Sequence, residues 1–334
     1  MMRLTLLTFL WLFGLVCPVV AVPGLEETWG YLDSGDRAAL RPDLPLTDVA
    51  VFAASINSRG QLVDVPAVPA RMPAGARRHL VVAELANFAL SHFVLDPVYP
   101  LRDKLVADLV AAASPYEGVQ VDFESVARLD KANYLQFLTR LKRGLGKKTL
   151  SVAVPARWKA VDDAQDYAAI AKIADRVVVM AYDEHWSTSA PGAISSVEWA
   201  SKVATYALRL LGPEKAVLGL PFYGRAWAEQ NPAGGYRYSG VQRLLGEAAL
   251  SPGRDEGGVP NFQFTRPVNY TVWFEDAVSL DIKTSLYLQV GVRKVAFWRL
   301  GQEDPAVWAV VQKKRGVPDL ADTPRYLLRQ SAAN

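Results

Sequence analysis

The sequence has very few of the residues that form disulfide bonds or bind transition metals. Its 334 residues include one cysteine, Cys17, and three histidines, His79, His92 and His185. One cysteine cannot form an intramolecular disulfide, and we expect Cys17 to belong to a leader segment, so the mature chain would offer no thiol nucleophile. The histidines are scattered without the spacing of zinc ligands. We therefore expect no metal site and no cofactor.

Runs of one charge are also missing. The formal net charge is only +3, and no cluster of lysine and arginine is long enough to indicate a nucleic-acid partner. The densest basic patch, at 142–148, follows an amphipathic helical segment, where cations complement the helix dipole. We interpret this patch as a solvated face.

Only one apolar run is long, and it lies at the start of the chain. Leu4–Val16 follows the cation Arg3 and is too short to span a membrane. Because small residues precede Ala21, residues 1–21 are predicted to be a signal peptide that is cleaved after this position. We then expect a secreted, periplasmic or cell-envelope protein with no stable membrane span. Lipidation of Cys17 and an uncleaved anchor are the alternatives.

The rest of the chain alternates between short apolar runs and segments with helical periodicity. The predicted strands are 28–32, 49–54, 80–83, 116–124, 150–155, 176–183, 216–223 and 292–298. The predicted helices are 102–113, 133–145, 167–174, 197–211, 276–290 and 304–314. Eight buried strands that alternate with helices predict an α/β fold, a closed (β/α)8 TIM barrel.

The alternative to a barrel is an open doubly wound sheet. No glycine-rich phosphate-binding turn follows the first predicted strand, which disfavours the nucleotide-binding form of that sheet. We expect residues 22–334 to form one barrel domain. A stretch at about 228–270, rich in glycine, proline and aromatic residues, interrupts the pattern and is predicted to be a small β-rich insertion after strand seven.

The predicted strand at 116–124 has polar side chains on one face. Strand side chains alternate, so Gln120, Asp122 and Glu124 point to the same side. The carboxyl end of a barrel strand is where an active site opens, and there Asp122 and Glu124 would be close neighbours. One of two such carboxyls should hold a proton; we predict a protonated Glu124 beside an ionised Asp122, as a general acid. A strand end with solvated acids is the alternative.

Several other polar and aromatic side chains fall at the ends of predicted strands. The predicted site consists of Tyr31, Asn87, Asp122, Glu124, Tyr182, Asp183, Tyr223 and Trp298. Aromatic faces stack on sugar rings and carboxylates transfer protons, so this set favours a carbohydrate site. Core packing is the alternative for Tyr31 and Tyr223. For Asp183 the alternative is a helix cap or a turn.

Four motifs in this order resemble those of glycoside hydrolase family 18, the chitinase-type barrels. Glu117-Gly-Val-Gln-Val-Asp-Phe-Glu124 is similar to the family's D-G-x-D-x-D-x-E. Met180-Ala-Tyr-Asp183 and Gly219-Leu-Pro-Phe-Tyr-Gly-Arg-Ala-Trp227 match two further motifs, and Trp298 the fourth. The resemblance covers roughly residues 28–314 and implies a TIM barrel that hydrolyses glycosidic bonds.

The resemblance also implies roles for single residues. Glu124 would protonate the glycosidic oxygen, and Asp122 would orient the 2-acetamido group of the substrate, whose oxygen is the nucleophile in this family. Tyr182 would bond the acetamido carbonyl. Substrate contacts are expected from Asp183 and Trp298, the latter as the floor under the reacting sugar. Gln120, Tyr31, Asn87 and Tyr223 complete the predicted substrate-binding set.

Two positions depart from the family motif. Glu117 replaces its first aspartate and Gln120 its middle one. Removing a charge at 120 should alter the pH profile, although an amide can still form a hydrogen bond to Asp122. An amide here, together with the stretch Ala181–Trp186, resembles the bacterial branch that trims peptidoglycan, including spore-cortex glucosaminidases. Members of that branch often bear cell-wall-binding repeats, and we find none in this sequence.

These features predict an exported hydrolase of β-linked N-acetylglucosamine polymers, peptidoglycan or a related polymer, acting with retention. We expect a monomer whose partner is this polymer. The alternatives are a chitinase or chitooligosaccharide hydrolase, a non-catalytic glycan-binding barrel, and a structural envelope protein with a vestigial site.

Overall fold

Eight parallel strands form a closed barrel, which confirms the predicted fold class. The computed structural model describes residues 24–229, 231–266 and 268–316, so the predicted signal peptide lies outside the described residues. The strands follow one another around the barrel in chain order, and the last pairs with the first. They are β1 (Glu27–Asp33), β2 (Asp48–Ile56), β4 (Arg77–Glu84), β5 (Gly118–Phe123), β6 (Thr149–Pro155), β7 (Arg176–Met180), β8 (Ala216–Pro221) and β14 (Lys294–Trp298).

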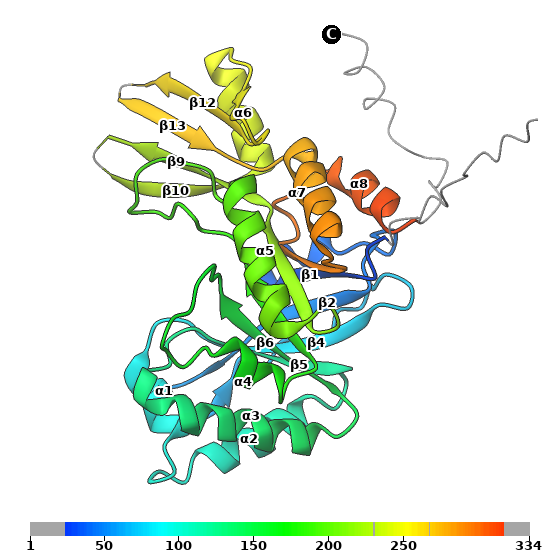
Figure 1. Ribbon diagram of the computed structural model, residues 1–334, viewed down its shortest axis with the longest axis vertical. Coiled ribbons are helices and arrows are strands. Elements are labelled where there is room, and N and C mark those ends of the chain that lie inside the picture. Colours follow the sequence, from blue (N-terminus) through cyan, green and yellow to red (C-terminus); the bar gives the residue numbers. More distant parts are fainter. Residues whose placement is uncertain (1–23, 230, 267, 317–334) are drawn as a thin grey trace, which may run out of the picture.

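Helices cover the outside of the barrel (Figure 1). They are α1 (Phe88–Leu95), α2 (Arg102–Ala112), α3 (Lys131–Leu145), α4 (Tyr167–Ala171), α5 (Val197–Leu211), α7 (Ala277–Val290) and α8 (Val307–Lys314). The first two connections lack a full helix. The short 3-10 helix η1 (Ser34–Ala39) follows β1, and β3 (Leu62–Val63) pairs antiparallel with the end of β2. No helix within the described ranges has the length and apolar character needed to cross a bilayer.

The alternation of β5 determines what faces the helices and what faces the barrel interior. Phe123 stacks on Phe137 of α3, with ring centroids 5.6 Å apart, and belongs to the main core between sheet and helices. The amphipathic pattern of α3 places its apolar stripe on this strand. Gln120 and Asp122 alternate with these positions and point inward, where both are buried. The sequence pattern therefore predicted the faces of this strand correctly.

The amino-terminal end of β5 lies at the opposite end of the barrel from Asp122. There, Glu117 forms an ion pair with Arg78, at 2.5 Å, which lowers the pKa of Glu117 to about 2. Gly118 is needed at this end because a Cβ atom would collide with the ring of His79. The change at Glu117 from the family motif therefore lies far from the carboxyl ends of the strands.

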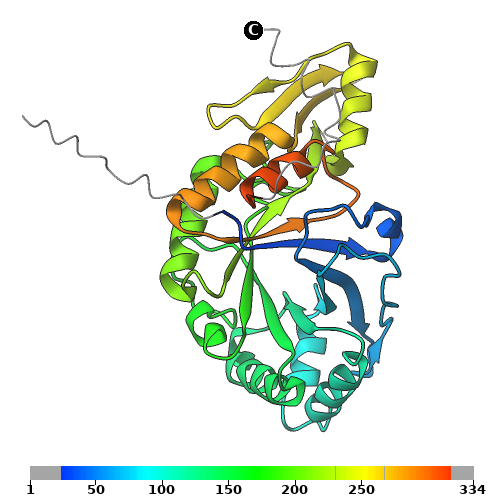
Figure 2. The same ribbon diagram turned by 90° about the vertical axis from the view of Figure 1, so that its right-hand side faces the viewer.

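A second, antiparallel sheet is inserted after β8 and projects from one side of the barrel (Figures 1 and 2). Its strand order is β10-β9-β13-β12-β11. Its elements are β9 (Tyr223–Ala228), β10 (Asn231–Arg237), α6 (Tyr238–Ala248), β11 (Gly253–Arg254), β12 (Pro260–Thr265) and β13 (Asn269–Trp273). This insertion is longer at both ends than the predicted 228–270, and it contains a helix that the composition of the segment did not indicate.

One face of the insertion sheet packs on α6. Val241 and Leu245 of α6 form an apolar cluster with Phe262 and Val272 of the sheet. The strand side chains on the opposite face begin with Tyr223, whose hydroxyl bonds to Asp183 beyond β7. This second face is therefore turned toward the carboxyl ends of the barrel strands.

Candidate active site

A cavity of about 460 Å³ opens at the carboxyl ends of the barrel strands. It brings together most of the side chains that the sequence predicted for one site. These are Tyr31, Asp122, Glu124, Tyr182, Asp183, Tyr223 and Trp298. The carboxyl ends of the strands thus meet as the barrel geometry requires.

Asn87, also predicted for this site, does not line the cavity. It is the N-cap of α1, where its side-chain oxygen accepts a 2.9 Å hydrogen bond from the backbone N–H of Leu90. Its own backbone N–H donates to Glu84. The residue therefore has a local helix-capping role that the sequence analysis did not consider, because α1 was not among the predicted helices.

Gln120 lies beneath the cavity and is fully buried. Its Oε1 accepts a 2.6 Å hydrogen bond from the hydroxyl of Tyr31, and its Nε2 donates to Ser151 at 3.2 Å. The hydrogen bond that an amide at this position could form with Asp122 is not present. Instead, Oδ1 of Asp122 is buried without a partner among the described residues.

Asp122 holds its proton unusually strongly. Burial, and then the negative charge of Glu124, raise the pKa of Asp122 to about 8. Burial and the charge of Asp183 also raise the pKa of Glu124. With a pKa of about 8, Asp122, which was predicted to be ionised, holds a proton near neutral pH. The pKa of Glu124 is raised as well, and its protonation stays a prediction.

Asp183 links the barrel to the insertion. The strand that was predicted to reach this residue ends at Met180, and Asp183 has a backbone φ of 59°, a conformation that aspartate tolerates better than most residues. Its Oδ1 accepts hydrogen bonds from the hydroxyl of Tyr223, at 2.5 Å, and from Nη2 of Arg225, at 2.7 Å. The alternative role as a helix cap is not observed, because α5 is capped by Ser196.

Aromatic rings form the apolar part of the cavity. The indole of Trp298 makes edge contacts with Tyr31 and Phe52, at centroid distances of 5.2 and 4.9 Å, which fix its orientation. The ring of Tyr182 packs against Tyr223. Burial raises the pKa of Tyr182 far above its ordinary value, so its phenol remains a neutral hydrogen-bond donor.

The cavity also has walls that the sequence analysis missed. They come from Phe52, Leu85, Met180, Arg225, Gly235, Tyr236, Arg237 and Gln302. Arg225 is part of the third motif and Phe52 lies on a predicted strand, so the sequence could have indicated that both line the cavity. Tyr236 and Arg237 belong to the insertion, and nothing in their local sequence indicates that they return to the barrel mouth.

The loop that carries Glu124 is attached to the loop after β4 at several points. The backbone N–H of Glu124 donates to the carbonyl of Glu84 at 2.9 Å, and the hydroxyl of Ser125 donates to the carbonyl of Leu85 at 3.1 Å. Farther along, His92 of α1 contacts Asp130 at the end of the short helix η2 (Arg128–Asp130). These contacts hold the acid-bearing loop in place.

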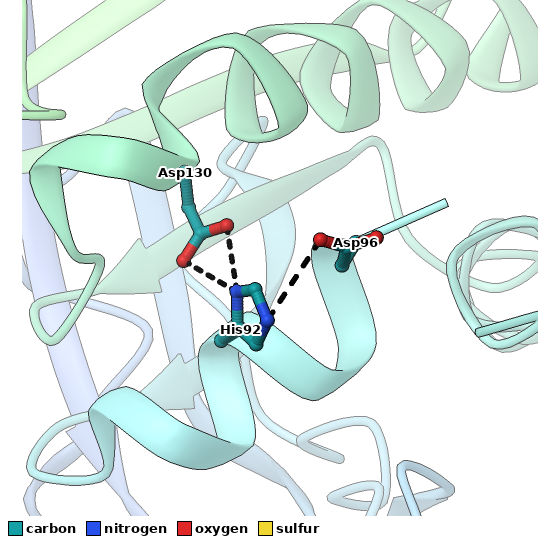
Figure 3. Close-up of side chains that lie close together, drawn as sticks. All are labelled: His92, Asp96 and Asp130. Atoms are coloured by element: carbon teal, nitrogen blue, oxygen red, sulfur yellow. Dashed lines mark hydrogen bonds and ion pairs between the residues drawn. The ribbon is translucent and has the colours of Figure 1, made fainter. Parts of the chain in front are cut away.

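His92, Asp96 and Asp130 form the one cluster of metal-binding side chains found among the described residues (Figure 3). Nδ1 of His92 lies 2.9 Å from the buried carboxylate of Asp130, and Nε2 lies 3.7 Å from Asp96. Because Asp130 already binds the ring, only Nε2 and Asp96 remain for a cation. His92 thus has acidic partners that its place in the sequence did not indicate, but this cluster does not line the cavity.

Comparison with known proteins agrees with the motifs. The model of the family described as Glycosyl hydrolases family 18 matches residues 81–303. A cortical fragment-lytic enzyme of Bacillus anthracis is 29% identical over 227 residues, which cover 63% of this chain and 53% of the relative. The chain spans between 53% and 64% of the length of the first curated relatives that it matches.

Solved structures resemble the fold closely. The Bacillus cereus spore cortex-lytic enzyme SleL has a TM-score of 0.77 and 25% identity, and the match covers 88% of this chain and 74% of that one. A chitinase from Chromobacterium violaceum has a TM-score of 0.73 and 27% identity, with 88% of this chain and 99% of that one covered.

Proposed function

Because the chain belongs to glycosyl hydrolases family 18, we propose that it hydrolyses β-linked N-acetylglucosamine polymers with retention, and that peptidoglycan is its substrate. The observation that carries this proposal is the pairing of Glu124 with a protonated Asp122 on the wall of one aromatic cavity. A proton held near neutral pH is what a general acid requires.

In the first step, Glu124 donates a proton to the glycosidic oxygen as the bond to the anomeric carbon breaks. The carbonyl oxygen of the substrate's own acetamido group attacks that carbon and forms an oxazolinium-like ring. Because this nucleophile is part of the substrate, much of the entropic cost of bringing it to the carbon is avoided. In the second step, water adds to the same carbon, and the carboxylate of Glu124 accepts its proton.

Asp122 would respond to the charge that develops in the first step. Its proton passes to Glu124 before the glycosidic oxygen is protonated, and the Asp122 carboxylate left behind stabilises the cationic ring as it forms. The neutral phenol of Tyr182 donates to the acetamido carbonyl, and Trp298 lies under the sugar. Asp183, held by Arg225, is in a position to bond a sugar hydroxyl.

Peptidoglycan is favoured over chitin by the names of the relatives, since cortical fragment-lytic and spore cortex-lytic enzymes match over most of the barrel. A chitinase remains the second candidate, because the Chromobacterium violaceum chitinase is as similar in sequence. With a substrate in the cell wall, the chain would be exported by its N-terminal segment and act as a monomer.

The test compares the chain with its Glu124→Gln variant for release of reducing ends from purified peptidoglycan and from chitooligosaccharides. Glu256→Gln, a change at an exposed glutamate of the insertion, is the matched control. Release from peptidoglycan that disappears only in Glu124→Gln supports the proposal. Release from chitooligosaccharides alone assigns the chain to the chitinases. Binding to both polymers without release contradicts hydrolysis and indicates a glycan-binding barrel.

A further inference from the structure

The peptide bond between Phe123 and Glu124 is held from both sides. Its N–H, which belongs to Glu124, donates to the carbonyl of Glu84 at 2.9 Å. Its carbonyl oxygen, which belongs to Phe123, accepts a 2.5 Å hydrogen bond from Nε2 of Gln165. The first contact comes from the end of β4, and the second comes from the loop between β6 and α4. Because this peptide bond joins β5 to the acid, its orientation determines where the Glu124 side chain points.

The neighbouring strand β6 offers no backbone donor to the carbonyl of Phe123. β5 pairs with β6 in parallel only as far as Val121. At the start of this pairing, the N–H of Thr149 donates to the carbonyl of Glu117. Such bonds repeat at every second residue, so the next donor for Phe123 would be residue 155. This residue is Pro155, which has no N–H.

Gln165 supplies the missing donor from a side chain. It is only 7% exposed, and the other end of its amide, Oε1, is buried without a hydrogen-bond donor among the described residues. Burying an amide with an unpaired oxygen is unfavourable, and an apolar side chain would fill the same space at a lower cost. Packing alone therefore does not explain a glutamine at this position, whereas the hydrogen bond to the carbonyl of Phe123 does.

The segment that carries Gln165 is itself fixed to its surroundings. The next residue, Asp166, is the N-cap of α4 and forms a 2.7 Å ion pair with Lys131 of α3. The hydroxyl of Tyr167 donates to the carbonyl of Pro155 at 2.6 Å. These contacts restrict the backbone on the C-terminal side of Gln165, so the amide is oriented before any substrate binds.

We propose that Gln165 is a positioning residue for the general acid, and that it orients the peptide bond before Glu124 so that the carboxyl lies beside the glycosidic oxygen. This role rests on the proposed function, because it takes Glu124 as the acid. Gln165 does not line the cavity, so it acts on the reaction only through this peptide bond. A small displacement of a catalytic group lowers the rate of the chemical step strongly. The affinity for substrate, which depends on the cavity walls, should not change.

The test compares two leaving groups. Gln165→Met retains the length of the side chain and removes the donor, while Gln165→Asn is a milder change that is one methylene too short to reach the carbonyl. Lys131→Met is the matched control, because it removes the ion pair to the same segment and leaves the carbonyl of Phe123 bonded. The substrates are one oligomer of the polymer that the chain cleaves, with either a sugar or dinitrophenolate as leaving group. Dinitrophenolate needs little protonation to leave, so the sugar leaving group depends far more on a well-placed acid.

Release of the leaving group is followed in a single turnover, which reports the first step alone. We expect Gln165→Met and Gln165→Asn to lower the rate for the sugar leaving group by about tenfold, out of the roughly 10²–10⁴-fold that general acid catalysis supplies. The rate for dinitrophenolate and the affinity for substrate should change little. The ratio of the two rates on one preparation does not depend on the folded fraction, so a less stable variant still gives an answer. Equal losses for both leaving groups, no loss in either Gln165 variant, or the same selective loss in Lys131→Met would overturn the proposal.

Failure of hydrolysis can be distinguished from failure of the positioning role. Hydrogen exchange at the amide of Glu124 reports on the same peptide bond without turnover. This exchange should become about tenfold faster in Gln165→Met and stay unchanged in Lys131→Met. Faster exchange in a chain that cleaves no polymer would support the positioning role and overturn the proposed hydrolase activity. Unchanged exchange in Gln165→Met would overturn the positioning role whatever the activity.

Discussion

Tyr31 donates a 2.6 Å hydrogen bond to Oε1 of Gln120 across the interior of the barrel. The other end of this amide donates to Ser151. Residue 120 is thus held by two side chains, and it offers Asp122 neither a charge nor a proton. Glu124 is then the neighbouring acid with which Asp122 can exchange its proton, and the charge of Glu124 contributes to the raised pKa of Asp122.

The decrease of kcat/KM at alkaline pH therefore tests how the uncharged Gln120 affects the pKa of Asp122. In the unaltered chain, kcat/KM should fall above a pH of about 8, where Asp122 loses the proton that the pair needs. In Gln120→Asp, a carboxylate is added near Asp122 and Glu124 and raises the pKa of Asp122 further. The pH at which kcat/KM falls should then increase by about one unit. Gln120→Asn adds no charge and should leave this pH unchanged. Identical profiles for the unaltered chain and Gln120→Asp would contradict this account.

Local patterns predicted the barrel well because its strands are buried on both faces and separated by amphipathic helices. The alternation at 119–124 was enough to assign the faces of β5 and to place Asp122 and Glu124 together. Asn87 was predicted for the site from its place after the third predicted strand. The structure places it at the N-cap of α1, a helix that was not among the predicted elements.

Contacts between distant segments could not be read from local patterns. The partner of Gln120 is Tyr31, 89 positions earlier in the chain, so its hydrogen bond depends on barrel closure. In the same way, Tyr236 and Arg237 reach the cavity only because the insertion sheet turns one face toward the barrel mouth. Burial, which raises the pKa of Asp122, is likewise a property of the closed barrel.

The raised pKa of Asp122 predicts that this side chain destabilises the fold at alkaline pH. Its folded pKa, about 8, exceeds the ordinary aspartate pKa of 3.8, so the native state binds its proton more strongly than the unfolded chain does. Stability is therefore lost as pH rises from about 4 to about 8. Asp122→Asn removes the charge and should increase the free energy of unfolding at pH 8.5 by a few kcal/mol, with little effect at pH 4.

Urea unfolding at both pH values checks this prediction, and Asp43→Asn, at an exposed aspartate, is the control. If Asp122→Asn is no more stable than the unaltered chain at pH 8.5, then burial of the Asp122 carboxylate does not destabilise the folded state. Its catalytic activity should be lost in either case, which is the usual conflict between stability and function at an active site.

The pair of His92 and Asp130 has a pH dependence of the same sign, but here the interaction stabilises the fold, so its removal should be destabilising (Figure 3). The hydrogen bond to Asp130 raises the pKa of His92 above 6.5. Its contribution to stability is then fully present below the unfolded pKa and is lost as pH rises through the folded pKa. Asp130→Asn should lower the melting temperature more at pH 5.5 than at pH 8.5. Asp108→Asn, in the more exposed pair with Lys104, should change it little at either pH. An equal decrease for Asp130→Asn at both pH values would exclude the charged pair as the cause.

A buried ion pair ties the end of the insertion to the barrel. Lys283 of α7 contacts Glu275, which follows β13, and neither side chain has any exposed surface. In Lys283→Met the buried carboxyl of Glu275 loses its cation and keeps the hydrogen bond that it accepts from the hydroxyl of Ser279, at 2.6 Å. The variant should lose about 3–5 kcal/mol of unfolding free energy at pH 7. The loss should shrink at pH 4, where the unfolded chain also carries this carboxyl in its protonated form.

The double variant Lys283→Met, Glu275→Leu separates the two contributions, because it removes the unpaired acid together with its partner. Its stability at pH 7 should return to near that of the unaltered chain, since hydrophobic residues of similar volume often replace a buried ion pair at little cost. Equal destabilisation in the single and double variants would mean that the attraction between the two charges, rather than the cost of an unpaired carboxylate, stabilises this junction.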